Sequence, residues 1–304
     1  SNLSYSFSGV MRATGYPRKS MYTILIGVGL NVILDPIFIF GLNMGIEGAA
    51  VATVISMFVS MLFVMSHFFN TKHQVHFRVG CFRPKARIIR NIVSIGMAPF
   101  LMNLAASVVN IIMNNQLVRE GGDLAIGAFG IINSFGMLIV MCVLGLCQGM
   151  QPIVGFNYGA GKHKRVKDVL LLTIRIATLI VTVGFLASEL FPRWLVRAFT
   201  DDPDLTAMAV HGMRLGYCLL FLDGFQIVVS VFLQSISKAQ KAVFMGLSRQ
   251  GIFLIPALYF FSRWFGLTGV WLSIPAADLL AAVVAILFLR SERRVFYPSS
   301  GRRV

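Results

Sequence analysis

The sequence predicts an all-α protein that crosses a membrane repeatedly, and three observations lead to that prediction. Hydrophobic residues make up 57% of the 304 residues, and charged residues make up only 13%. A soluble domain usually carries about 25% charged residues, so most of this surface must face something other than water. Apolar stretches long enough to cross about 30 Å of hydrocarbon recur along the chain, and the basic residues gather in alternate loops between them.

Eight apolar segments are each long enough to span a bilayer as a helix. We place these spans at residues 22–41, 47–69, 93–117, 125–150, 169–191, 209–235, 243–261 and 267–288. The four cysteines show no CxxC spacing, so the sequence indicates neither a disulfide framework nor a metal site of that kind.

The basic residues fall mostly on one side of these spans. We assign to this side Arg12, Arg18, Lys19, Lys72, Arg78, Arg83, Lys85, Arg87, Arg90, Lys162, Lys164, Arg165, Lys167, Lys238, Lys241, Arg249, Arg290, Arg293, Arg294, Arg302 and Arg303, which are 21 of the 27 basic residues. By the positive-inside rule this side is cytoplasmic, so we expect a multi-pass protein of the cell (inner) membrane with both ends of the sequence inside. The net charge of +15 is then a signal of topology and not of nucleic-acid binding.

Two glycine motifs suggest an internal repeat. Gly45-Ile46-Glu47-Gly48 resembles Gly266-Leu267-Thr268-Gly269, which lies 221 residues later. Many transporters are built from duplicated membrane units, although loop glycines can also match by chance. We expect residues 1–69 to end a first six-helix lobe, 70–91 to be a basic cytoplasmic linker, 92–290 to form a second six-helix lobe and 291–304 to be a basic cytoplasmic tail. About 130 residues would then precede Ser1 in a protein of about twelve spans.

Five short motifs resemble the multidrug and toxic compound extrusion (MATE) transporters. The motifs are Arg12-Ala13-Thr14-Gly15, Leu30-Asn31-Val32-Ile33-Leu34-Asp35-Pro36, Phe40-Gly41 with Gly45-Ile46-Glu47-Gly48-Ala49-Ala50, Gln148-Gly149-Met150-Gln151-Pro152-Ile153, and Asn157-Tyr158-Gly159-Ala160-Gly161. They occur in the family's order and at its spacing between about residues 8 and 289. The resemblance implies an inverted-V bundle of two lobes without a resident cofactor, which exchanges an inward Na⁺ or H⁺ for an outward organic molecule. The expected partners are membrane lipid and a small amphipathic substrate, and we expect a monomer.

Asp35 is the sharpest candidate for an ion-binding residue, because a charge inside a span costs about 2.5–3.5 kcal/mol on insertion scales and so suggests function. Asn31 lies four residues earlier, on the same helix face, and Pro36 cannot donate a hydrogen bond to the carbonyl of Val32. Such oxygens suit Na⁺, and a carboxylate in apolar surroundings can hold H⁺ instead. The resemblance to archaeal and bacterial MATE proteins places Asn31, Asp35 and Thr53 in one cation site. Alternatively, Asp35 caps a kinked helix near the outer surface.

The second repeat lacks this group of oxygens. Its counterpart of Asp35 is Ile255 or Pro256, and its counterpart of Thr53 is Ile274. We therefore expect one coupling site, in the first lobe, and no metal site beyond a possible Na⁺ at that place.

A polar stripe and a mid-span carboxylate predict the lining of a substrate cavity. The stripe consists of Asn103, Ser107, Asn110 and Asn114, spaced i, i+4, i+7 and i+11. Lipid cannot satisfy such groups, so they must face a wet cavity or another helix. The resemblance adds Asp223 and Gln226, since some MATE proteins use an aspartate at that place for cation or substrate binding. The alternative is that these side chains join helices, as we expect for Asp278.

The leading functional prediction is a secondary active antiporter that exports amphipathic, cationic drugs or toxins in exchange for Na⁺ or H⁺. One alternative is a lipid-linked oligosaccharide flippase of related architecture, which would need a strongly cationic cavity for pyrophosphate. Another alternative is an inactive transporter fragment. The sequence contains no HExxH or GxSxG motif and no paired acidic motif of the prenyltransferase kind, so we do not expect an enzyme.

Overall fold

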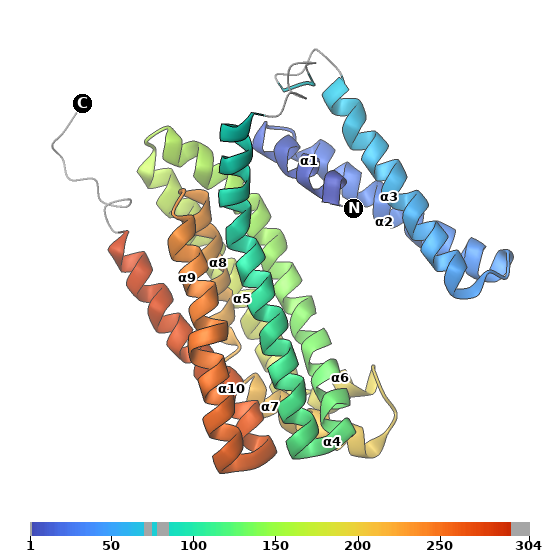
Figure 1. Ribbon diagram of the computed structural model, residues 1–304, viewed down its shortest axis with the longest axis vertical. Helices are drawn as coiled ribbons and strands as arrows, with labels where there is room; N and C mark the ends of the chain where they lie inside the picture. The colour runs from blue at the N-terminus through green and yellow to red at the C-terminus, as the bar shows by residue number, and fades with distance from the viewer. Residues whose placement is uncertain (1, 70–74, 78–84, 293–304) are drawn as a thin grey trace. The chain divides into compact units, whose positions relative to one another are not determined.

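The computed structural model describes residues 2–69, 75–77 and 85–292, and within them it contains helices and no strands (Figure 1). This confirms the all-α prediction for the described part of the chain. The elements are α1 (Asn2–Ala13), α2 (Pro17–Pro36), the π-helix η1 (Ile37–Gly41), α3 (Gly45–Phe69), α4 (Ala86–Gly159), α5 (His163–Leu190), α6 (Pro192–Arg197), α7 (Pro203–Gly216), α8 (Phe221–Ser235), α9 (Ala239–Leu247), the π-helix η3 (Ser248–Leu254) and α10 (Ile255–Ser291). Several of the basic residues assigned to the cytoplasm lie outside the described residues, namely Lys72, Arg78, Arg83, Arg293, Arg294, Arg302 and Arg303.

The chain divides into two compact units, Ser1–Ile89 and Arg90–Val304, which we call the first and the second unit. The division falls within the predicted linker, residues 70–91. Helices α1 to α3 belong to the first unit, and nearly all of α4 together with the later helices belongs to the second.

In the first unit α2 and α3 run side by side as an antiparallel pair, and α1 packs against both (Figure 1). Pro17 opens α2 at a position where a missing N–H is harmless, because the first donors of a helix have no partner within it. Near the end of α2, Pro36 cannot donate a hydrogen bond, and the chain continues as the wider π-helix η1. There the Leu42 N–H reaches back five residues to the Ile37 carbonyl at 2.9 Å. The apolar core of this unit consists of Met11, Val64 and Phe68.

Two long helices of the second unit each carry two of the predicted spans. The helical stretch at residues 100–159 is broken at Gly122, and the stretch Ala239–Ser291 is broken at Gly266; both glycines have positive φ. The described residues hold five helices long and apolar enough to cross a membrane, or six if the pair α7 and α8, bent by 59°, is one span. Dividing both long helices at their glycines and counting the bent pair once gives the eight predicted segments.

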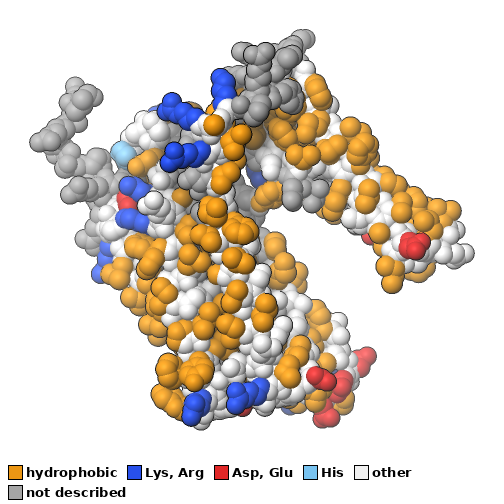
Figure 2. All heavy atoms as spheres, in the orientation of Figure 1, with side chains coloured by type: hydrophobic (Ala, Val, Ile, Leu, Met, Phe, Trp, Pro, Cys, Tyr) orange, Lys and Arg blue, Asp and Glu red, His pale blue; other side chains and the backbone are white. Residues whose placement is uncertain are grey.

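The second unit has a packed interior and an apolar exterior. Its largest fully buried side chains include Trp271, Phe232 and Met213. Large apolar side chains also cover its outside, for example Leu179 and Val183 of α5, which are 65% and 58% exposed. Hydrophobic side chains occupy the middle of the visible face of this unit, and charged side chains gather at its ends (Figure 2). This distribution suits a bilayer, whose hydrocarbon solvates the apolar middle.

The two motifs of the predicted repeat share two local features of the backbone, a positive φ at the first glycine and a close approach at the second. Gly45 has a φ of 57° and Gly266 a φ of 55°, a left-handed conformation that only glycine adopts readily. Three residues after each, Gly48 and Gly269 lie so close to the end of the preceding helix that a Cβ would collide with the backbone carbonyl of Phe38 or Phe261. Both motifs therefore use one glycine to turn the chain and another to bring consecutive spans into contact.

Candidate functional site

The structure brings together the three residues of the predicted cation site. Asn31 and Asp35 lie on α2, and the Asn31 Nδ2 donates a hydrogen bond to Asp35 Oδ1 at 3.0 Å. The same nitrogen lies 3.4 Å from Thr53 Oγ1 on the neighbouring helix α3, a longer and weaker contact. The Thr53 hydroxyl itself donates to the Ala49 carbonyl at 2.8 Å. All three side chains are partly buried.

The local sequence explains this geometry. The spacing of four residues places Asn31 and Asp35 one turn apart on the same face of α2. Since Pro36 has no N–H, the carbonyl of Val32 receives no helical hydrogen bond from it. Thr53 reaches the pair because the short turn at Gly45 returns the chain as α3 beside α2.

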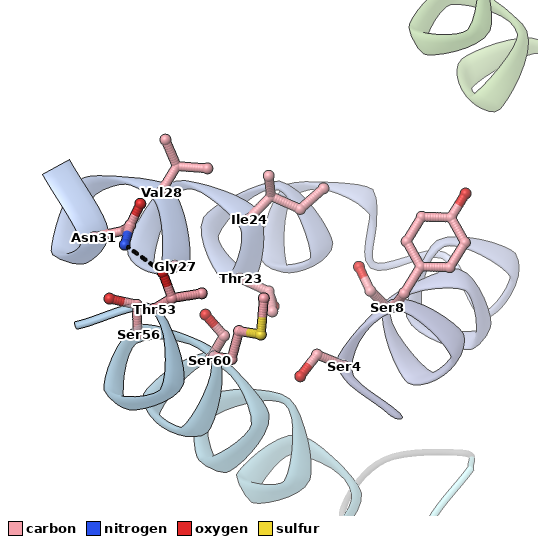
Figure 3. Close-up of a pocket in the computed structure, with 12 residues that line it drawn as sticks. Ser4, Ser8, Thr23, Ile24, Gly27, Val28, Asn31, Thr53, Ser56 and Ser60 are labelled. Carbon is pink, nitrogen blue, oxygen red and sulfur yellow. Dashed lines mark hydrogen bonds between the residues drawn. The ribbon is translucent and has the colours of Figure 1, made fainter. Parts of the chain in front are cut away.

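A cavity of about 330 Å³ adjoins this cluster in the first unit (Figure 3). Asn31 and Thr53 line one end of it, and serine and threonine residues from all three helices are among the other lining residues, although most of the lining surface is apolar. The serine and threonine residues of the lining are Ser4, Ser8, Thr23, Thr53, Ser56 and Ser60. Most of these were missed in the sequence, although the spacing of Thr53, Ser56 and Ser60 (i, i+3, i+7) and of Thr23, Gly27 and Asn31 (i, i+4, i+8) marks one face of each helix.

Three charged side chains meet in the interior of the second unit. Arg249 of η3 contacts Asp278 of α10 through Nε at 2.7 Å and through Nη2 at 2.6 Å. Its Nη2 also lies 3.2 Å from both carboxylate oxygens of Asp223 on α8. The side chains of Asp278, Asp223 and Arg249 are 4%, 11% and 34% exposed. We refer to these three residues as the charged triad.

The position of Arg249 corrects the sequence analysis. Counting Arg249 with the cytoplasmic loop charges is wrong, because the residue lies inside the helical stretch Ala239–Ser291, before its break at Gly266, and binds two interior carboxylates. Arg249 therefore leaves the set of basic residues on which the predicted orientation depends, and the orientation itself stays a prediction. Asp278 lies at a contact between helices, as expected, and that contact is ionic.

The predicted substrate residues fall into two groups. Asn103, Ser107, Asn110 and Asn114 are all exposed along one face of α4. Asn110 also lines a cavity of about 220 Å³ that includes Asn133, Arg249, Gln250 and Asp278. Gln226, in contrast, is buried, and its Nε2 donates to the backbone carbonyl of Asp278 at 2.7 Å. The side chains of the polar stripe are thus exposed, whereas Gln226 joins α8 to α10.

The sequence of this chain is similar to those of known multidrug export proteins. Multidrug export protein MepA from Staphylococcus aureus (strain MSSA476) is 32% identical over 278 residues, which are 91% of this chain and 61% of MepA. MepA from Staphylococcus haemolyticus (strain JCSC1435) is 30% identical over 282 residues. The chain therefore spans about three-fifths of the length of these relatives.

Solved structures of MATE transporters agree with the fold. A crystal structure of MATE in complex with MaL6 matches with a TM-score of 0.87 and 26% identity, over 98% of this chain and 67% of that one. An outward-facing MATE family transporter of the MOP superfamily matches with a TM-score of 0.86 and 26% identity, over 97% of this chain and 67% of that one. The MatE family model itself matches residues 97–260, more than half of the chain. The chain belongs to the MatE family, the MATE transporters.

Proposed function

We propose that this protein is a secondary active antiporter, and not an enzyme, which exports amphipathic organic cations across the cell membrane in exchange for Na⁺ or H⁺. Membership of the MatE family and the name of the Staphylococcus aureus relative, a multidrug export protein, support the export of drug-like molecules. One observation carries the proposed exchange for an ion. Asn31 contacts both Asp35 and Thr53, which unites an amide, a carboxylate and a hydroxyl inside a transmembrane unit.

The amide of Asn31 offers a simple route to ion exchange. Its nitrogen lies between Asp35 Oδ1 and Thr53 Oγ1, the position in which a cation would be attracted to both oxygens. Half a turn about the Cβ–Cγ bond would withdraw the N–H groups and present the amide oxygen instead. Na⁺ would then meet oxygens from all three side chains. A proton would bind Asp35, and the amide oxygen of Asn31 would accept the hydrogen bond of the protonated carboxyl.

The proposed organic substrate binds on the second unit. The exposed stripe Asn103, Ser107, Asn110 and Asn114 provides neutral hydrogen-bonding groups. Met137 and Met141, which are exposed on the second half of α4, add adaptable apolar contacts of the kind found in promiscuous sites. Asp223 and Asp278, which share Arg249 in the charged triad, together supply negative charge for a cationic group. Coupling further requires that the ion and the substrate favour different conformations of the protein.

The charged triad argues against the flippase alternative. A pyrophosphate group would need several unpaired cationic side chains. Among the described residues that line the cavity beside the triad, Arg249 is the one cationic side chain, and two carboxylates bind it.

The experiment that tests the proposed function is dye efflux from cells that lack their own exporters and produce the full protein. We expect efflux of a fluorescent monovalent cation. The Na⁺ gradient and the H⁺ gradient are collapsed in separate experiments, and efflux should stop when the gradient of the coupling ion is removed. Asp35→Asn should reduce efflux to the level of cells without the protein, because the amide cannot carry the ion's counter-charge. The matched control is Glu47→Gln, which neutralises an exposed carboxylate at the start of α3 and should leave efflux unchanged. Unchanged efflux by Asp35→Asn, at an equal amount of protein in the membrane, would refute the role of Asp35.

A further inference from the structure

In the charged triad, the guanidinium of Arg249 contacts the two carboxylates at unequal distances. Asp278 receives two contacts of 2.6 and 2.7 Å, which is the usual length of a charge-assisted hydrogen bond. Asp223 receives longer contacts of 3.2 Å from a single nitrogen. Arg249 is therefore bound chiefly to Asp278 in this structure, and Asp223 is its second partner.

When both carboxylates are ionised, the charged triad has one net negative charge, because Arg249 neutralises only one of them. Charges inside a membrane protein are costly unless they are paired, so a single additional positive charge is strongly favoured there. The residues that line the adjoining cavity supply no second cation, since Arg249 is the one cationic residue among the described lining residues. A ligand with one positive charge would complete the balance.

The cavity beside Asp278 is the place where such a charge fits. It measures about 220 Å³, which is smaller than the 300–1,000 Å³ of common ligand pockets and so suits a head group better than a whole amphipathic molecule. Its polar lining offers oxygen acceptors from Asn110, Asn133, Gln250 and Asp278. The Gln250 Oε1 is buried and accepts no hydrogen bond from the described residues. Both contacts of Arg249 with Asp278 use Oδ1, which leaves Oδ2 available.

We propose that Arg249 is a movable counter-cation, which leaves Asp278 for Asp223 when the ammonium group of a substrate enters the cavity. The inference rests on the proposed function and names its substrate class, because a site with one unbalanced negative charge selects monocations. The guanidinium already touches Asp223, so the shift needs no new partner. η3 is a π-helix, a form that is often found at functional sites. The bond from Gln226 Nε2 to the Asp278 carbonyl holds α8 and α10 together while the guanidinium moves.

The test uses three amphipathic probes with the same apolar body and different heads. The first carries one trimethylammonium group, the second carries its neutral tert-butyl isostere, and the third carries two ammonium groups. Dissociation constants are measured with the full protein in lipid nanodiscs. Asp278→Asn and Asp223→Asn should each weaken binding of the monocation by about tenfold or more. Asp278→Asn removes the carboxylate that pairs with the ammonium group, and Asp223→Asn removes the carboxylate that receives the displaced Arg249. The isostere should bind all variants alike.

Two double variants separate this role from simple structural pairing. Asp223→Asn with Arg249→Gln leaves Asp278 as the one remaining charge, and we expect it to bind the monocation at least as tightly as the unaltered protein. Asp278→Asn with Arg249→Gln has the same net charge but leaves Asp223, which does not line the cavity, so binding should stay weak. Lys241→Gln breaks an ion pair with Glu292 elsewhere in the second unit and should change nothing.

The outcomes distinguish the two proposals. If the protein exports the monocation but both double variants bind it equally, Arg249 is structural and the inference fails alone. If the unaltered protein neither exports nor binds the monocation, the proposed function fails and the inference falls with it. Preference for the dication by the unaltered protein would also overturn the charge balance on which the inference depends.

Discussion

At the scale of single residues, glycines decide how closely α2, η1 and α3 approach each other. A Cβ at Gly27 would collide with the Ser60 hydroxyl, and a Cβ at Gly48 would collide with the Phe38 carbonyl. Asn31 and Thr53 lie on the same two helices, so their contact depends on this close approach. The glycines thus support the proposed ion site without contributing an oxygen to it.

Gly48→Ala should therefore destabilise the protein, by about 1–3 kcal/mol if the helices move apart to admit the methyl group. The matched variant is Gly29→Ala, at a position of α2 where nothing lies within 4 Å of an added Cβ. It should be neutral or stabilise the helix by up to about 1 kcal/mol, since alanine is the better helix former. Thermal unfolding in detergent measures both effects. Equal unfolding temperatures for the two variants would show that the approach at Gly48 is not tight.

At the scale of helices, polar contacts join α8, η3 and α10 within the apolar core of the second unit. The sequence could predict the spans, because hydropathy and loop charge act over whole segments. It could also predict that Asn31 faces Asp35, because that spacing is local. It could not predict the charged triad, since Arg249 lies 26 residues from Asp223 and 29 from Asp278, and only tertiary packing brings them together. An arginine near the end of a span contributes the same hydropathy value whether its side chain faces solvent or binds a carboxylate.

We expect Gln226 to be a structural residue and Asn110 to be a substrate-binding residue. Gln226→Leu removes the hydrogen bond between α8 and α10 and should lower stability by about 0.5–2 kcal/mol, the usual range for polar contacts within membranes. It should leave substrate affinity nearly unchanged. Asn110→Leu alters an exposed cavity residue, so it should weaken substrate binding and leave the unfolding temperature unchanged. The opposite pattern would mean that the stripe on α4 joins helices and that Gln226 faces the substrate.

At the scale of the whole molecule, the distribution of charge predicts the orientation in the membrane. Basic residues such as Lys162, Lys164 and Arg165 lie at one end of α5, and the acidic residues Asp201 and Asp202 follow its other end. The positive-inside rule places the first group in the cytoplasm. The repeat, with matching glycine turns at Gly45 and Gly266, fits a protein built from two similar units.

Cysteine labelling tests this orientation. In a background in which the four native cysteines are replaced by serine, Lys164→Cys should react with a membrane-impermeant maleimide only in inverted vesicles. Asp201→Cys, on the opposite side, should react in intact cells. Both positions are exposed, so a lack of reaction reports the membrane and not burial. Labelling of Lys164→Cys in intact cells would reverse the topology.

In the proposed exchange, an ion bound at Asn31, Asp35 and Thr53 drives the export of an organic cation. The most direct measurement is exchange in proteoliposomes that contain only the purified full protein, with ion flux and substrate flux recorded together. We predict that an imposed gradient of Na⁺ or H⁺ drives substrate in the opposite direction, and that Asp35→Asn abolishes both fluxes while substrate binding persists. If the ion gradient drives substrate through Asp35→Asn as fast as through the unaltered protein, the proposed role of this ion site is contradicted.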